Sequence, residues 1–199
     1  TRLRTVTGVQ TCALPIFVLG IGGIRFLRAL NIVPAVYHMN EGHAAFLTLE
    51  LLSEQLQKGL EKEKAEESVR RQCIFTTHTP VPAGHDRFPA DLIQFTLHPY
   101  AERMKLTFAE LMEYGQISGS QDKGQFTMTV LGLKFSRGAN GVSKKHGEIS
   151  RYMWMDLYPV KDAKKVPIGY ITNGVHMPSW TSRTTWEFWE RHNSHKWKE

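Results

Sequence analysis

Three short apolar stretches, each followed by a polar turn and separated by helical patterns, restrict this chain to few folds. Residues 33–38, 73–76 and 167–172 are typical of buried strands, and the last stretch runs into Asn173-Gly174. The segments between them carry apolar residues at helical spacing. Strands that alternate with helices predict a parallel sheet with helices on both faces, a Rossmann-like α/β fold.

The clearest helical pattern follows the first predicted strand. Asn40 is expected to N-cap a helix, with Glu41 in the first turn, where a negative charge is favoured by the helix dipole. A charged helix over 61–71 is expected next. The first of these helices carries one apolar stripe for the core, formed by Phe46, Leu49, Leu52, Leu56 and Leu60.

Other local signals divide the rest of the chain. Gly22-Gly23 predicts a turn before a short helix, and Thr107 with Glu110 forms a capping box that opens another. Further helices are expected from residue 89 and over 126–135 and 143–153, with a loop at 117–125 and a short strand or link at 138–142.

Charge and apolar content limit the partners of the chain. The formal net charge is +6, but basic and acidic residues alternate, as over 61–64, which indicates a solvated surface and no nucleic-acid partner. The longest apolar run, 17–24, is too short for a membrane span and is broken by glycines. Cys12 and Cys73 lie far apart without metal or disulfide spacing, which favours a cytoplasmic location.

Candidate site residues follow the predicted strand ends. They are His38, Glu41 and His43 after the first strand, His78, His85 and Asp86 after the second, and Asn173 and His176 after the last. A parallel sheet would bring all three sets to one edge. For any one of them, a purely structural role as a cap, turn or buried strand histidine stays open.

Three kinds of chemistry compete for these residues. A zinc site is disfavoured because the spacing of His38, Glu41 and His43 is not that of the HExxH pair and no cysteine supports it. A hydrolase triad is disfavoured because the chain has no GxSxG turn and no nucleophile signature around Cys73. Sugar recognition fits better, since Asn, His and Glu side chains on shaped loops read hydroxyl groups.

Four long motifs, in order, resemble the bacterial α-glucan phosphorylases: YHMNEGHAAFLTLELL, FTTHTPVPAGHDRFP, FSRGANGVSKKHGEISRYMW and ITNGVHMPSW. The resemblance covers residues 17–180 and implies the two-domain GT-B glycosyltransferase architecture. Residues 17–172 would be the latter part of its N-terminal domain, and 173–199 the start of the crossing to the C-terminal domain. Residues 1–16 resemble a translated sequencing adapter and are expected not to belong to the fold.

The resemblance also implies an activity for the complete enzyme. Such enzymes split α-1,4-glucans (glycogen, starch or maltodextrin) with inorganic phosphate, giving glucose 1-phosphate with retention, and some are homo-oligomers. Their pyridoxal 5′-phosphate acts through its phosphate, and its lysine lies in the C-terminal domain, so no lysine here takes that role. This chain alone is therefore expected to be inactive.

Two alternatives remain at this stage. A GT-B glucan synthase shares the two-domain plan but would carry a Lys-x-Gly-Gly loop near its start, whereas the GANGVSKKHGE and THTPVPAGHD motifs favour the phosphorylase. A non-catalytic carbohydrate-binding module is the other, although the chain has no repeated aromatic platforms.

Three residues match functional positions of the family. His78 matches the histidine beside the transferred glucose, with its carbonyl aligned for the oxocarbenium-like charge and its side chain at the 6-hydroxyl. Asn173 matches an asparagine that binds the same hydroxyl, and Glu41 stands where an acidic residue lies near the acceptor glucose. The resemblance assigns no role to His43, His85 or Asn140.

Overall fold

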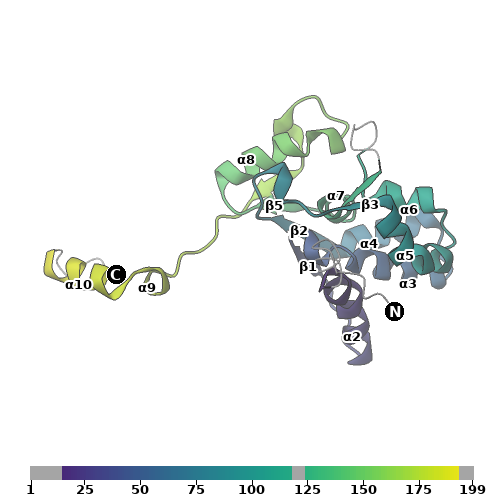
Figure 1. The fold of residues 1–199 in the computed structure, drawn as a ribbon, viewed down its shortest axis with the longest axis horizontal. Helices are drawn as coiled ribbons and strands as arrows, with labels where there is room; N and C mark the ends of the chain where they lie inside the picture. The colour runs from purple at the N-terminus through teal and green to yellow at the C-terminus, as the bar shows by residue number, and fades with distance from the viewer. Residues whose placement is uncertain (1–14, 118–123, 193–199) are drawn as a thin grey trace, which may run out of the picture.

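A computed structural model describes residues 15–117 and 124–192. Its centre is a four-stranded, fully parallel sheet in the order β1-β2-β5-β6, so strand order follows chain order (Figure 1). The four strands are β1 (Tyr37–Asn40), β2 (Cys73–Thr77), β5 (Ala139–Gly141) and β6 (Ile168–Tyr170). A separate antiparallel pair joins β3 (Arg87–Pro89) to β4 (Gln125–Thr127). The expected parallel α/β sheet is confirmed.

Helices connect each strand of the sheet to the next. The crossing from β1 to β2 runs through α3 and α4, and the crossing from β2 to β5 runs through α5, α6 and α7. The crossing from β5 to β6 runs through α8. The described helices are η1 (Val18–Gly22), α2 (Gly23–Ala29), η2 (Gly42–Ala44), α3 (Leu47–Gln57), α4 (Lys62–Gln72), η3 (Pro82–Gly84), α5 (Ala90–Met104), α6 (Phe108–Tyr114), α7 (Met128–Lys134), α8 (Lys144–Met153), η4 (Met155–Leu157), η5 (Ala163–Lys165), α9 (Met177–Trp180) and α10 (Arg183–His192).

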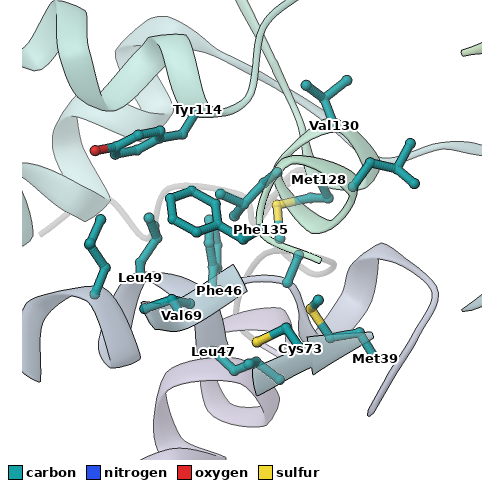
Figure 2. Packing of buried hydrophobic residues seen from close by; sticks show 14 of the residues in the cluster. Met39, Phe46, Leu47, Leu49, Val69, Cys73, Tyr114, Met128, Val130 and Phe135 are labelled. Carbon is teal, nitrogen blue, oxygen red and sulfur yellow. The ribbon is translucent and has the colours of Figure 1, made fainter. Parts of the chain in front are cut away.

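The core lies on one face of the sheet. Each crossover adds the next strand on the same side of the previous one. Right-handed crossovers in this order place all their helices on one face of the sheet, and the core lies beneath them. A Cβ added to Gly132 of α7 would lie 2.6 Å from the Phe75 ring, and one added to Gly147 of α8 would lie 2.7 Å from the carbonyl oxygen of Gly169. Figure 2 shows Met39 and Cys73 of the strands beneath Phe46, Met128 and Phe135.

The opposite face is more polar and less covered. The strand register aligns Asn40, Thr76 and Asn140 on it, with His38 and Ile74 on the same side. His38 and Asn40 are exposed, and Asn140 is half-buried. Within the described residues, the helices therefore cover mainly the other face, which differs from the expectation of helices on both.

The predicted apolar stripe is confirmed. Phe46, Leu49 and Leu52 are fully buried, and Leu56 and Leu60 pack at the margin of the core. The Phe46 ring lies between those of Phe17 and Phe126, with ring centroids 4.7 Å and 6.2 Å away. The capping box of Thr107 and Glu110 is also present at the start of α6.

Three expected boundaries were wrong. Gly22-Gly23 is not a turn, since η1 continues directly into α2. The first strand begins at Tyr37 rather than at residue 33, and the Val33 side chain is 72% exposed. Phe126 lies in β4, where pairing with β3 draws the segment 125–127 out of the expected helix.

The chain leaves the sheet after Asn173, whose amide still donates to the Val142 carbonyl. Residues 171–176 are exposed, and α9 and α10 lie apart from the rest of the molecule (Figure 1). None of the helices in the described ranges has the length and apolar character that a membrane crossing requires.

Candidate functional site

The carboxyl ends of the four parallel strands meet at one edge of the sheet, as the sequence predicted. Register pairs Asn40 with Thr76, and Thr77 with Gly141. Beyond β6 the chain stays alongside β5, because the amide of Asn173 donates to the Val142 carbonyl at 3.1 Å. The residues that follow β1, β2 and β5 therefore share this edge with Asn173, in the position where parallel α/β sheets bind ligands.

Glu41 does not lie in the first turn of a helix, and Asn40 does not cap one. Asn40 is the last residue of β1, and the Glu41 amide still donates to the Thr76 carbonyl at 2.8 Å. Glu41 then adopts φ 63° and ψ −179°, a region that a non-glycine residue occupies at a cost of about 1–3 kcal/mol. This conformation turns the chain sharply into η2. Sheet pairing, which sequence alone does not show, thus overrides the capping signal.

The Glu41 carboxylate is buried and binds the turn that follows β2. Its Oε1 accepts hydrogen bonds from the Thr79 amide at 2.8 Å, from the Thr77 hydroxyl at 3.0 Å and from the His78 amide. Burial by itself would raise the pKa of Glu41, but these hydrogen bonds to the ionised form outweigh it and lower the pKa below its usual value. Glu41 is therefore held as a carboxylate inside the site.

His78 lies at the middle of this turn with its side chain exposed at the sheet edge. Asn173 is also exposed, on the strand-like segment beside Val142. The structure therefore brings Glu41, His78 and Asn173 to one edge, with one carboxylate buried and two polar side chains open to solvent.

The three residues without an assigned role join neighbouring loops or strands near this edge. His43 Nδ1 lies 3.2 Å from Asp86 Oδ2, which joins the loops after β1 and β2. Buried His85 contacts the Thr129 hydroxyl at 2.9 Å. Asn140 accepts a hydrogen bond from the Thr76 hydroxyl at 3.0 Å.

The His85 ring is buried and packs against an aromatic side chain. Its ring meets Trp154 edge-on, with centroids 4.9 Å apart. Burial lowers the pKa of His85, which the Glu41 carboxylate opposes. The ring of His85 is thus packed in the loop that follows β2.

Two of the predicted candidates lie away from this group. His38 points from the open face of the sheet, with its Nε2 2.7 Å from the Thr76 hydroxyl. His176 follows the exposed segment and contacts Ser179 through its side chain at 2.7 Å. Sequence reasoning missed Thr77 and Thr79, which bind Glu41. Thr77 binds through its hydroxyl, which the sequence does show. Thr79 binds through its backbone amide, which any residue except proline could supply, so the sequence carries no signal for it.

Glu41, His78 and Asn173 do not gather into a set of metal ligands. In the described part of the chain, no three His, Cys, Asp or Glu side chains converge as metal ligands would. Burial lowers the pKa of Lys134, but its Nζ donates to the carbonyl oxygen of Gln116 at 2.7 Å. Lys134 ends α7 just before β5 begins, at the amino end of the sheet and not at this carboxyl edge.

The fold and the edge together define an α/β domain whose parallel sheet carries exposed polar side chains at its carboxyl edge. No family model matches the sequence. The chain is 41% identical over 172 residues to a glycogen phosphorylase of Mycobacterium tuberculosis. The matched residues make up 82% of this chain and 20% of that protein. It is 38% identical over 182 residues to a maltodextrin phosphorylase of Thermococcus litoralis, covering 91% of this chain and 21% of the relative. A glycogen phosphorylase of Aquifex aeolicus is 34% identical over 163 residues.

The chain spans about a fifth of the length of the first two of these relatives. Over the residues that it shares with them, it belongs to the family of glycogen and maltodextrin phosphorylases.

Proposed function

We propose that this chain forms the glucose-positioning edge of an α-1,4-glucan phosphorylase. The observation that carries the proposal is the convergence of His78 and Asn173 at the carboxyl edge of the sheet, in a chain that is similar to phosphorylases along most of its length. The complete enzyme would transfer a glucosyl unit from glycogen, starch or maltodextrin to inorganic phosphate. The product would be glucose 1-phosphate, with retention at the anomeric carbon.

In this proposal the edge supplies orientation and electrostatic stabilisation. The His78 side chain and Asn173 hold the sugar ring through a hydroxyl group, while the His78 carbonyl dipole faces the positive charge that develops on the glucosyl unit. A dipole fixed in a water-poor cleft contributes on the order of a few kcal/mol to transition-state stability. Glu41 lies deeper in the same edge, towards the acceptor sugar.

The rest of the chemistry belongs to the two-domain GT-B enzyme. Residues 17–172 would be part of its N-terminal domain, and the segment from residue 173 would begin the crossing to the second domain. Pyridoxal phosphate would be held by that second domain and would supply a phosphate group for proton transfer. The buried thiol of Cys73 agrees with a reducing, cytoplasmic location for the enzyme.

Binding of a glucan to the isotope-labelled chain tests this proposal. Titration with maltoheptaose should shift the backbone resonances of His78 and Asn173, and the variants H78A and N173A should weaken binding. H98A is the matched control, because His98 is exposed on α5 and pairs with Glu102. Shifts confined to other surfaces would contradict the proposed edge.

An activity assay tests the two-domain part separately. With maltoheptaose and phosphate, the 199-residue chain should form no glucose 1-phosphate, because the cleft and cofactor need the second domain. Product formation by the purified chain would contradict that requirement.

A further inference from the structure

One oxygen atom of Glu41 holds three consecutive residues. Oε1 accepts from the Thr77 hydroxyl at 3.0 Å, from the Thr79 amide at 2.8 Å and from the His78 amide between them. The Glu41 side chain is enclosed, with the residue only 8% exposed. Oε1 is therefore fully engaged by the turn.

The geometry of one peptide links Glu41 to the carbonyl of His78. The peptide between His78 and Thr79 is trans, so its N–H and C=O point in opposite directions. Since the N–H of Thr79 points at the Glu41 carboxylate, the carbonyl oxygen of His78 points away from it. Glu41 therefore sets the direction of this carbonyl without touching it.

The same hydrogen bond also polarises the peptide. A carboxylate bound to a peptide N–H draws the proton towards itself, which increases the negative partial charge on the carbonyl oxygen at the other end. The effect is stronger at a buried carboxylate, where solvent screens it less. The His78 carbonyl is thus a better partner for a cation than an ordinary backbone carbonyl.

The backbone of Glu41 indicates that this contact is specifically maintained. With φ 63° and ψ −179°, Glu41 occupies a region that glycine adopts far more easily. The chain keeps a side chain here in spite of the strain, and that side chain makes the three contacts with the turn. A residue needed only for the bend would not require a carboxylate.

We propose that Glu41 is a positioning residue that aims and polarises the His78 carbonyl towards a sugar-shaped cation at the sheet edge. The inference rests on the proposed function, in which this carbonyl faces a glucosyl unit that gains positive charge. It assigns to Glu41 an action through the peptide instead of a contact with the acceptor sugar.

The first test follows the peptide itself in the labelled chain. The amide proton of Thr79 and the carbonyl carbon of His78 should titrate together as the Glu41 carboxylate is protonated at low pH. E41Q keeps the size and an acceptor oxygen but removes the charge, so this shared step should disappear. E54Q is the matched control, because Glu54 pairs with Arg28 and its loss should leave the step intact. Persistence of the step in E41Q would overturn the proposal.

The second test compares a cationic with a neutral ligand. The probes are a piperidine iminosugar, protonated at the ring nitrogen that replaces the anomeric carbon, and glucose. E41Q should raise the Kd of the iminosugar roughly three- to tenfold and change that of glucose by less than about twofold, because only the cation senses the carbonyl charge.

The outcomes separate the two proposals. Equal weakening of both probes would show that Glu41 contacts the sugar or merely holds the loop, and the inference would fail. If the wild-type chain binds neither probe, the proposed function fails for this edge, and the titration still decides whether Glu41 controls the peptide.

Discussion

The hydroxyl of Thr76 donates a hydrogen bond to Oδ1 of Asn140 at 3.0 Å, across the central strands β2 and β5. The Thr76 hydroxyl oxygen also lies 2.7 Å from Nε2 of His38 on β1. Because a hydroxyl has one proton, which is given to Asn140, the His38 nitrogen must be the donor of the second bond. Three strands are thus joined by side chains on the open face of the sheet.

Replacing this hydroxyl should weaken the sheet. T76V keeps the β-branched shape but leaves two polar groups without their partner, so we expect a loss of about 1–2 kcal/mol in the free energy of unfolding. Urea denaturation measures it. T96V is the control, because the Thr96 hydroxyl donates to the Leu92 carbonyl within α5. Equal losses in the two variants would contradict a special role for the link between strands.

A methyl group at Gly132 should disturb the core. The added Cβ would lie 2.6 Å from Phe75, whose side chain is fully buried between α7 and β2. Overpacking of this kind costs about 1–3 kcal/mol, so G132A should lower the melting temperature. In contrast, G23A in α2 meets nothing within 4 Å and should be neutral or stabilising by up to about 1 kcal/mol. Equal melting temperatures of G132A and G23A would contradict the close packing of α7 on β2.

Removal of the Thr107 cap should destabilise α6. The Thr107 hydroxyl accepts from the Glu110 amide, and the Glu110 carboxylate accepts from the Thr107 amide at 2.8 Å. T107A should therefore lose about 1 kcal/mol in chemical denaturation. T107S restores the hydroxyl and should recover most of the loss, whereas no recovery would indicate that the methyl group of Thr107 matters instead.

Alkaline pH should reduce stability through Cys73. Burial raises the pKa of this thiol from 9.0 to about 12. As pH rises above about 9, the unfolded chain loses this proton first, so the unfolded state gains stability between about pH 9 and 12. The denaturation midpoint should fall over that range, and less so in C73A. An identical pH dependence in C73A would assign the effect to other groups.

The same thiol should be protected from alkylation in the folded state. In a C12S background, iodoacetamide at pH 8 should modify Cys73 only in urea, because Cys73 has no exposed surface and the reactive thiolate is disfavoured. Peptide mass spectrometry detects the adduct. Rapid modification of the native chain would show that the strand β2 opens readily.

Local sequence patterns predicted most elements that depend on neighbouring residues. The stripe from Phe46 to Leu60, the charged helix α4 and the cap at Thr107 were all found close to their expected positions. Each of these depends on contacts within a few residues, or on the burial of one apolar face, which periodicity records directly.

Errors occurred where a distant strand decided the local structure. Asn40 and Glu41 have the composition of a helix start, but pairing with β2 extends β1 through Asn40. Phe126 has a helical context, yet pairing with Phe88 places it in a strand. Propensity is a weak preference, and hydrogen bonds to another strand outweigh it.

The sequence by itself determined the order of the parallel strands and of the main helices between them, the apolar faces and the set of polar residues at the strand ends. Only the tertiary structure decided that the Glu41 carboxylate binds the amides of His78 and Thr79. The reason is physical: a backbone amide is present at every residue except proline, so its partner depends on where strands from distant segments end in space, and residue identity carries no record of that choice.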